Sequence, residues 1–154
     1  MIHPAPTTRI DPKIARGVLV SAGPSVVKVA FPNTNYELHL VPQGAITTQP
    51  GKRILGAISA QARRIDVVQT GGRYVEPVIG RPRRVQGSVI AVLPESNTIV
   101  VDAGMPIHIT PTDPRQKAAD FQPGQFVAFD VLEGTSFTPQ AAAPLAAAAP
   151  SPTP

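Results

Sequence analysis

Apolar and polar residues alternate along several short segments of this chain. In residues 37–40, Leu38 and Leu40 are apolar, whereas Glu37 and His39 are polar. This period of two predicts β-strands with one face against a core and the other toward solvent. The apolar residues are mainly Val, Ile, Leu and Ala, and β-branched residues favour strands. The pattern therefore predicts an all-β protein.

Two segments of similar sequence follow each other along the chain. The first begins at Gly17 with "GVLVSAGPSVVKVAF" and the second at Gly87 with "GSVIAVLPESNTIVV", and each reads as strand, turn and strand. Each then passes through a third strand, "ELHLVP" or "PIHITP", to a "QPG" turn that precedes a fourth strand. This repetition predicts an internal duplication.

The second copy holds a short insertion within the stretch "TPTDPRQKAADFQPG". Asp113 followed by Pro114 is typical of a helix start, "RQKAAD" continues for two turns, and Gly124 lies beyond the end. Further strands are expected at "RRIDVV", "GGRYVEPVIG" and "TSFTP". Three strands, a short helix and one or two closing strands describe an OB-like barrel of five strands.

The chain accordingly divides into five segments. We expect a flexible N-terminal arm (1–13), a first β-barrel repeat (14–70), a basic joint with an extended strand (71–86), a second β-barrel repeat (87–138) and a disordered Ala/Pro-rich tail (139–154). The fold prediction is two tandem OB-like small β-barrels related by internal duplication, with a short helix in the second copy. The alternative is one larger sandwich in which the two copies share sheets.

The spacing of glycine, strand, proline and turn in both copies resembles the TOBE and Mop small β-barrels. The resemblance covers about two-thirds of the chain. It rests on Gly17, 26–29, 38–42 and Pro50-Gly51 onward in the first copy, and on Gly87, 99–101, 107–111 and Pro123-Gly124 onward in the second. These OB-like modules often occur in pairs, and some bind oxyanions such as molybdate. The resemblance therefore implies an oxyanion-binding pair of barrels.

Composition narrows the class of protein. Hydrophobic residues make up 42% and charged residues 16%, which is typical of a folded chain. The absence of cysteine excludes disulfides and thiolate metal sites. The first residues lack the apolar segment of a secretory signal, and no apolar run approaches the ~20 residues that span a bilayer. We expect a cytoplasmic protein with no membrane partner.

Charge is distributed unevenly. Residues 1–86 hold twelve of the fourteen Lys and Arg but four of the ten Asp and Glu. Six arginines fall between positions 63 and 84, and arginine suits phosphate because its planar guanidinium donates paired hydrogen bonds. Tyrosines nearby could stack on bases. The candidate nucleic-acid-binding residues are Arg63, Arg64, Arg73, Arg81, Arg83, Arg84, Lys28, Tyr36 and Tyr74.

Signs of catalysis are weak. Glu37 and His39 share a strand face, but Pro106 stands where the second copy would need the carboxylate beside His108. The chain has neither a nucleophile elbow nor a phosphate-cradling glycine loop. We expect no catalytic residue, no metal and no cofactor.

The first hypothesis is a non-enzymatic module that binds RNA or single-stranded nucleic acid through the arginine-rich joint. The second is an adaptor or self-assembling structural protein, whose basic half contacts the acidic half of a neighbour. The third is the oxyanion-binding pair that the resemblance implies.

Overall fold

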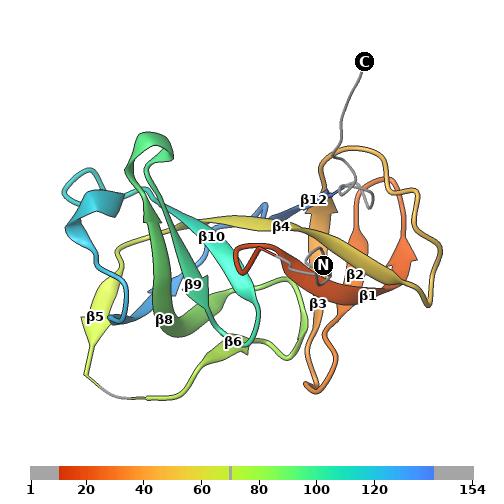
Figure 1. Cartoon of the computed structure of the whole chain (residues 1–154), viewed down its shortest axis with the longest axis horizontal. Coiled ribbons are helices and arrows are strands. Elements are labelled where there is room, and N and C mark those ends of the chain that lie inside the picture. The colour runs from red at the N-terminus through yellow and green to blue at the C-terminus, as the bar shows by residue number, and fades with distance from the viewer. Residues whose placement is uncertain (1–10, 70, 141–154) are drawn as a thin grey trace, which may run out of the picture.

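The structure is a computed structural model that describes residues 11–69 and 71–140 (Figure 1). The described chain is all-β, as the alternation predicted, and its only helical pieces are single 3-10 turns. The strands are β1 (Ala15–Ala22), β2 (Val27–Ala30), β3 (Glu37–Pro42), β4 (Arg53–Ala62), β5 (Asp66–Val68), β6 (Tyr74–Glu76), β7 (Ile79–Gly80), β8 (Arg84–Leu93), β9 (Thr98–Asp102), β10 (Pro106–Pro111), β11 (Phe126–Asp130) and β12 (Ser136–Pro139). The 3-10 turns are η2 (Pro94–Ser96) and η3 (Ala118–Asp120).

Five strands close a small barrel. β1, β2 and β3 form an antiparallel run, β12 lies parallel to β3, and β4 pairs with both β12 and β1. Closure leaves no free edge along most of these strands, which is how small β-proteins avoid edge-to-edge association. The prediction of a five-strand β-barrel is therefore confirmed for this group of strands.

β4 is the strand that links this barrel to the rest of the molecule (Figure 1). Its first half, Arg53–Gly56, pairs with β1, whereas its second half, Ser59–Ala62, runs parallel to β10. From β10 the sheet continues through β9, β8 and β11 to β5. The end of β11 returns to the end of β4 through a bridge between Val131 and Ala62.

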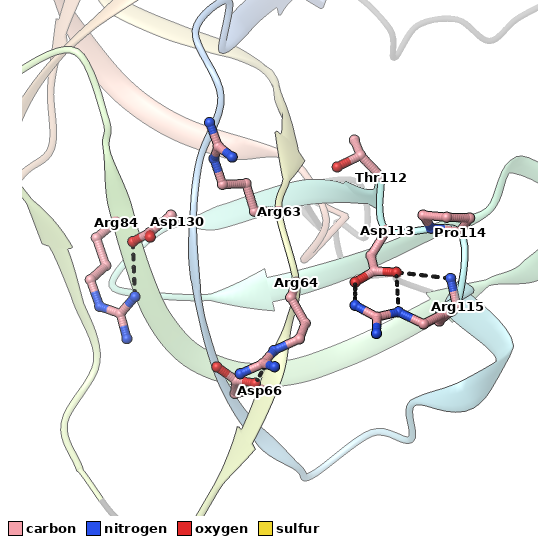
Figure 2. A pocket seen from close by; sticks show the side chains of 9 residues that line it. All are labelled: Arg63, Arg64, Asp66, Arg84, Thr112, Asp113, Pro114, Arg115 and Asp130. Atoms are coloured by element: carbon pink, nitrogen blue, oxygen red, sulfur yellow. Dashed lines mark hydrogen bonds and ion pairs between the residues drawn. The ribbon is translucent and has the colours of Figure 1, made fainter.

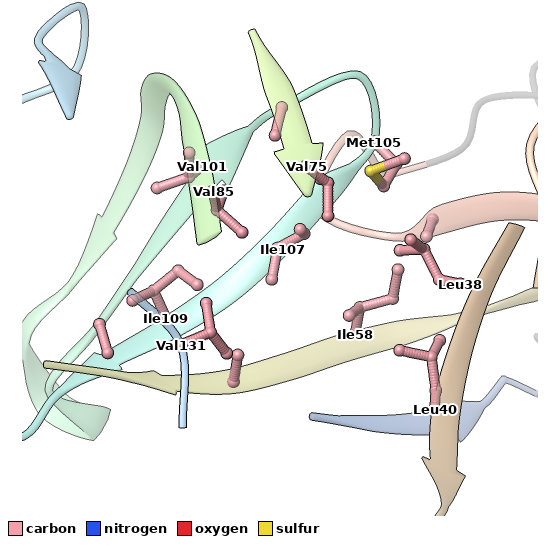
Figure 3. Close-up of a cluster of buried hydrophobic side chains, with 14 of the residues drawn as sticks. Leu38, Leu40, Ile58, Val75, Val85, Val101, Met105, Ile107, Ile109 and Val131 are labelled. Atoms are coloured by element: carbon pink, nitrogen blue, oxygen red, sulfur yellow. The ribbon is translucent and has the colours of Figure 1, made fainter. Parts of the chain in front are cut away.

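One hydrophobic core runs through both groups of strands (Figure 3). Leu38 and Leu40 of β3 are buried, as their alternation predicted, and they belong to the same cluster as Ile107 and Ile109 of β10. Ile58, in the middle of β4, is also fully buried in this cluster. Because the core is continuous along β4, the two groups of strands are packed as one body.

The predicted helix after Asp113 is wrong. The Asp113 carboxylate accepts hydrogen bonds from the Arg115 backbone N–H and guanidinium, so the segment forms a turn. The Gln116 side chain then bonds both the N–H and the carbonyl of Ile65. Such side-chain bonds to the backbone compete with a helix, and helical geometry is limited to the single turn η3.

The further strands predicted after the fourth strand of each copy and in the joint are placed partly as expected. "RRIDVV" contains β5, and "GGRYVEPVIG" contains β6 and β7. The strand expected in "TSFTP" is β12, but it pairs with β3 and β4 rather than with strands of the second repeat.

The arm was expected over 1–13 and the tail over 139–154, and residues 1–10 and 141–154 of them lie outside the described residues. Among the described residues, no helix has the length and apolar character needed to cross a membrane.

Candidate functional site

Four arginines line one open hollow of about 780 Å³ (Figure 2). Arg63 and Arg64 directly follow β4, Arg84 begins β8, and Arg115 lies in the turn after β10. The other lining residues are Asp66, Thr112, Asp113, Pro114 and Asp130. We call this hollow the arginine pocket.

Backbone pairing brings these distant segments together. The Arg63 N–H donates to the carbonyl of Asp130 at 3.0 Å, and Arg84 stands directly opposite Asp130 in the β8–β11 ladder. The Gln116 amide fixes the turn that carries Arg115 against the segment after β4. The pocket is therefore built by the ends of β4 and β11 and the start of β8, which are ordered parts of the sheet.

Three of the four guanidinium groups are paired with carboxylates. The nitrogen–oxygen distances are 2.9 Å for Arg64–Asp66, Arg84–Asp130 and Arg115–Asp113. The Arg64 and Arg115 side chains are 66% and 80% exposed, so these ion pairs add little stability. They do orient the guanidinium groups, each of which has five N–H donors and so keeps donors beyond those used in its ion pair.

The ion pairs also shift ionisation. Hydrogen bonds from the Arg115 side chain and backbone lower the pKa of Asp113 from 3.8 to about 2. Side-chain hydrogen bonds with Tyr74, which has the larger effect, and with Asp130 raise the pKa of Arg84 above its usual value. The Asp113 carboxylate and the Arg84 guanidinium therefore remain charged near neutral pH.

Arg63 differs from the other three. Among residues 11–69 and 71–140, no carboxylate lies within ion-pair distance of its guanidinium. The pocket thus holds four arginines and three aspartates. Arg63 provides the charge that an anion could neutralise.

The other candidate arginines are not lining residues of the pocket. Arg73 pairs with Asp102 at 2.7 Å, and Arg81 lies 3.8 Å from Glu133. Arg83 is tied into the backbone near the pocket, since its carbonyl accepts the Val131 N–H at 2.8 Å.

The remaining candidates have structural contacts of their own. Lys28 stands opposite His39 in the β2–β3 ladder, within the first barrel. The Tyr36 hydroxyl accepts the Val75 N–H at 3.2 Å, and the Tyr74 hydroxyl donates to Gln86 at 3.3 Å. Both rings are half-buried. Their hydroxyls hold β6 in place, which leaves limited ring surface for a base.

The two repeat histidines have different partners. His39 Nε2 lies 3.0 Å from the Glu37 carboxylate, and His108 Nε2 lies 2.9 Å from the Lys13 carbonyl. No group of three or more His, Cys, Asp or Glu within the described residues could hold a metal ion.

The structure changes the assignment of positive charge to the two groups of strands. Residues 63–140 carry eight Lys and Arg and eight Asp and Glu, whereas residues 11–62 carry five and two. The excess positive charge therefore lies on the first barrel.

Sequence reasoning missed Arg16 and Arg53, which are 37 positions apart but line a second hollow of about 850 Å³. Only the pairing of β1 with β4 brings them together.

Comparison with known proteins finds no family whose pattern matches this chain. It also finds no similar protein among the curated proteins.

Proposed function

We propose that this chain is a non-enzymatic binding module for RNA or single-stranded DNA, with the arginine pocket as its phosphate-binding site. The observation that supports this proposal is the convergence of Arg63, Arg64, Arg84 and Arg115 from three separate segments on one open hollow. An open, shallow site suits a flexible strand that lies across the surface.

Arg63 is the first phosphate ligand in this proposal, because no described carboxylate competes for it. The three paired arginines contribute their outward N–H donors, and their aspartates hold them in place. Since three carboxylates oppose four guanidinium groups, the attraction is moderate and depends strongly on salt. Each phosphate contact on a single strand contributes about 0.7 to the log–log salt slope.

The same proposal includes a duplicated fold, in which two copies of one five-strand unit exchange their closing strands. Its support is the agreement of the ladders. Gly17 stands opposite the fourth strand of its copy at Ile54, and Gly87 does so at Val127. A bulge follows two residues later in each case, before Ser21 and before Ala91.

The closing strands agree as well. In the first unit, β12 lies parallel to β3 and antiparallel to β4. In the second, the latter half of β4 lies parallel to β10 and meets β11 at the bridge between Ala62 and Val131. Each unit thus takes its fifth strand from the chain segment that follows the fourth strand of the other unit.

The test is binding of a dye-labelled twelve-nucleotide single-stranded RNA, measured by fluorescence polarisation at several salt concentrations. Changing Arg63 and Arg84 together to alanine should weaken binding and flatten the salt slope by about 1.4, if each contacts one phosphate. The matched control is the Arg16→Ala/Arg53→Ala pair, which removes equal charge from the first barrel and should leave the slope at the arginine pocket unchanged.

Two results would count against the proposal. An unchanged slope in the pocket variant would mean that the RNA contacts other residues or does not bind. Dissociation of oligomers in sizing experiments, with RNA binding unaltered, would instead favour the self-assembling alternative.

A further inference from the structure

The first strand of the barrel has an edge that is only partly paired. Backbone groups point alternately to the two sides of a strand. The Leu19 N–H donates to the Lys52 carbonyl, and the Leu19 carbonyl accepts from the Gly51 N–H, just before β4. The backbone groups of Ala15 and Gly17 therefore also face β4. Arg16 therefore turns its N–H and carbonyl to the opposite side, where pairing with β2 begins only at Val18. Within the described residues, no strand pairs with β1 at Arg16 on that side.

The corresponding edge of the other group of strands is covered. There β6 pairs with the start of β8, where Tyr74 stands opposite Gln86 and Val75 opposite Val85. Val75 is buried in the core at 1% exposure. By the ladder agreement, Gln86 corresponds to Arg16 and Val85 to Ala15. A three-residue strand with an apolar central residue thus covers one edge, and the matching edge of β1 has no such cover among the described residues.

The residues around the β1 edge indicate the chemistry of a segment that could bind there. The edge opens on the hollow of about 850 Å³ that also includes Phe31 and Met105. Arg16 and Arg53 lie on the outer face of β1 and β4 as diagonal neighbours across the ladder, about 7–8 Å apart between backbones. Neither side chain has a carboxylate within ion-pair distance in the described part of the chain. Among the described residues, the edge thus combines backbone groups without a strand partner, an apolar floor and two arginines. Asp11 also lines this hollow, but its carboxylate is paired with Lys13.

We propose that this edge binds an extended acidic peptide of a partner protein, which adds to β1 as a short antiparallel strand. Strand addition supplies main-chain hydrogen bonds, and alternate side chains supply selectivity. The peptide residue opposite Arg16 shares the outer face with Arg16, so a Glu there would lie beside the Arg16 side chain. Arg53, across β1 from the peptide, adds positive charge to the same face. The next residue, opposite Ala15, points inward and occupies the place that Val75 has against Val85. The preferred pattern is acidic–Val–acidic, and this interaction is separate from the proposed phosphate site.

The chemistry of the chain itself favours a partner over self-pairing. The residues 70 positions before Tyr74, Val75 and Glu76 are Pro4, Ala5 and Pro6. Proline has no backbone N–H, so Pro4 and Pro6 could donate no hydrogen bond to a strand edge. They also carry no charge to neutralise Arg16.

The experiment uses the full chain and a dye-labelled peptide, Ser-Glu-Val-Glu-Val-Glu-Ser, with both ends blocked. Fluorescence polarisation should detect saturable binding, and the Arg16→Glu/Arg53→Glu variant should weaken it at least tenfold. Methylation of the peptide backbone nitrogens should also abolish binding, because it removes the main-chain donors without changing charge. An Arg63→Glu/Arg84→Glu variant carries the same charge change at the arginine pocket and should bind the peptide as the unmodified chain does.

Far-UV circular dichroism of each variant confirms that the fold is retained, and amide shifts of Arg16 on peptide addition report the site directly. Equal binding of the methylated peptide would overturn strand addition, since charge alone would then account for the affinity. Equal weakening by both charge-reversal pairs would also overturn the proposal. Displacement of the peptide by single-stranded RNA from the β1 edge would assign this edge to nucleic acid instead.

Discussion

Closure of the barrel by β12 can be tested through one contact, that between Phe137 and Gly56. Phe137 is fully buried in β12, and a Cβ added at Gly56 would collide with its ring and with the Thr138 carbonyl. A buried phenylalanine removes about 150 Å² or more from water, which at about 25 cal/mol per Å² corresponds to about 4 kcal/mol. The cavity left behind adds to this loss, and measured Phe→Ala costs in cores are about 3–5 kcal/mol.

We expect Phe137→Ala to lower the free energy of unfolding by about 4 kcal/mol, which is a large part of the about 5–15 kcal/mol that stabilises a typical domain. Urea unfolding followed by far-UV circular dichroism is the suitable assay, since the chain has no Trp and two Tyr. Val67→Ala is the control, because Val67 is 54% exposed and its truncation should change stability by less than about 0.5 kcal/mol.

A double-mutant cycle makes this test specific to the contact. Gly56→Ala alone should destabilise, because the added methyl overpacks the β4–β12 ladder. In the Phe137→Ala background the ring no longer obstructs that methyl, so the double mutant should lose at least about 1 kcal/mol less than the sum of the single changes. Strict additivity, together with a cost below about 1 kcal/mol for Phe137→Ala, would refute closure of the barrel by β12.

Three further predictions follow from local geometry. Gly87→Ala should destabilise by at least about 1–3 kcal/mol in urea unfolding, because its Cβ would collide with the backbone of the neighbouring strand, whereas Gly72→Ala meets open space and should not. Gln116→Ala should cost about 1–3 kcal/mol in the same assay, because it removes two hydrogen bonds to one loop and leaves buried backbone groups unsatisfied. Carboxyl NMR should give Asp113 a pKa of about 2, and Arg115→Ala should raise this pKa toward 3.8. Because folding lowers this pKa, the pair stabilises the fold above about pH 4, and its contribution should disappear as the pH falls through about 2.

Local patterns in the sequence predicted much of the fold. Alternation identified the buried faces of β3 and other strands, because burial of one face imposes a period of two on each strand separately. The short strands β5, β6 and β12 followed from the same pattern with turn residues at their ends. The helix after Asp113 failed because capping residues fit a tight turn as well as a helix start, and the Gln116 contact to Ile65 comes from a segment 51 positions away.

Partner choice between strands was beyond the sequence. Nothing in "TSFTP" distinguishes a strand that pairs with its own repeat from one that pairs with β3, since both need an apolar residue at Phe137. The candidate site shows the same limit. A count of arginines along the chain found Arg63, Arg64 and Arg84. It did not find the carboxylate partner of Arg84, because Asp130 lies far from Arg84 in the sequence, whereas Asp66 lies close to its partner Arg64. Charge compensation and the proximity of Arg16 to Arg53 depend on which strands meet, and that depends on the whole fold.

The two proposed sites lie at opposite ends of β4, and this placement determines how their tests should be interpreted. Arg53 begins the strand, and Arg63 directly follows its last residue. Ten strand residues extend over about 33 Å, which is several times the Debye length of about 8 Å at physiological salt. Charge changes at one end should therefore leave the potential at the other end unaltered. A long polyanion could contact both ends, whereas a seven-residue peptide seated at the β1 edge could not extend far beyond its own site. Weakened RNA binding in both pairs of arginine variants would then indicate one strand that contacts both ends of β4, and an effect confined to one pair would identify the end that binds.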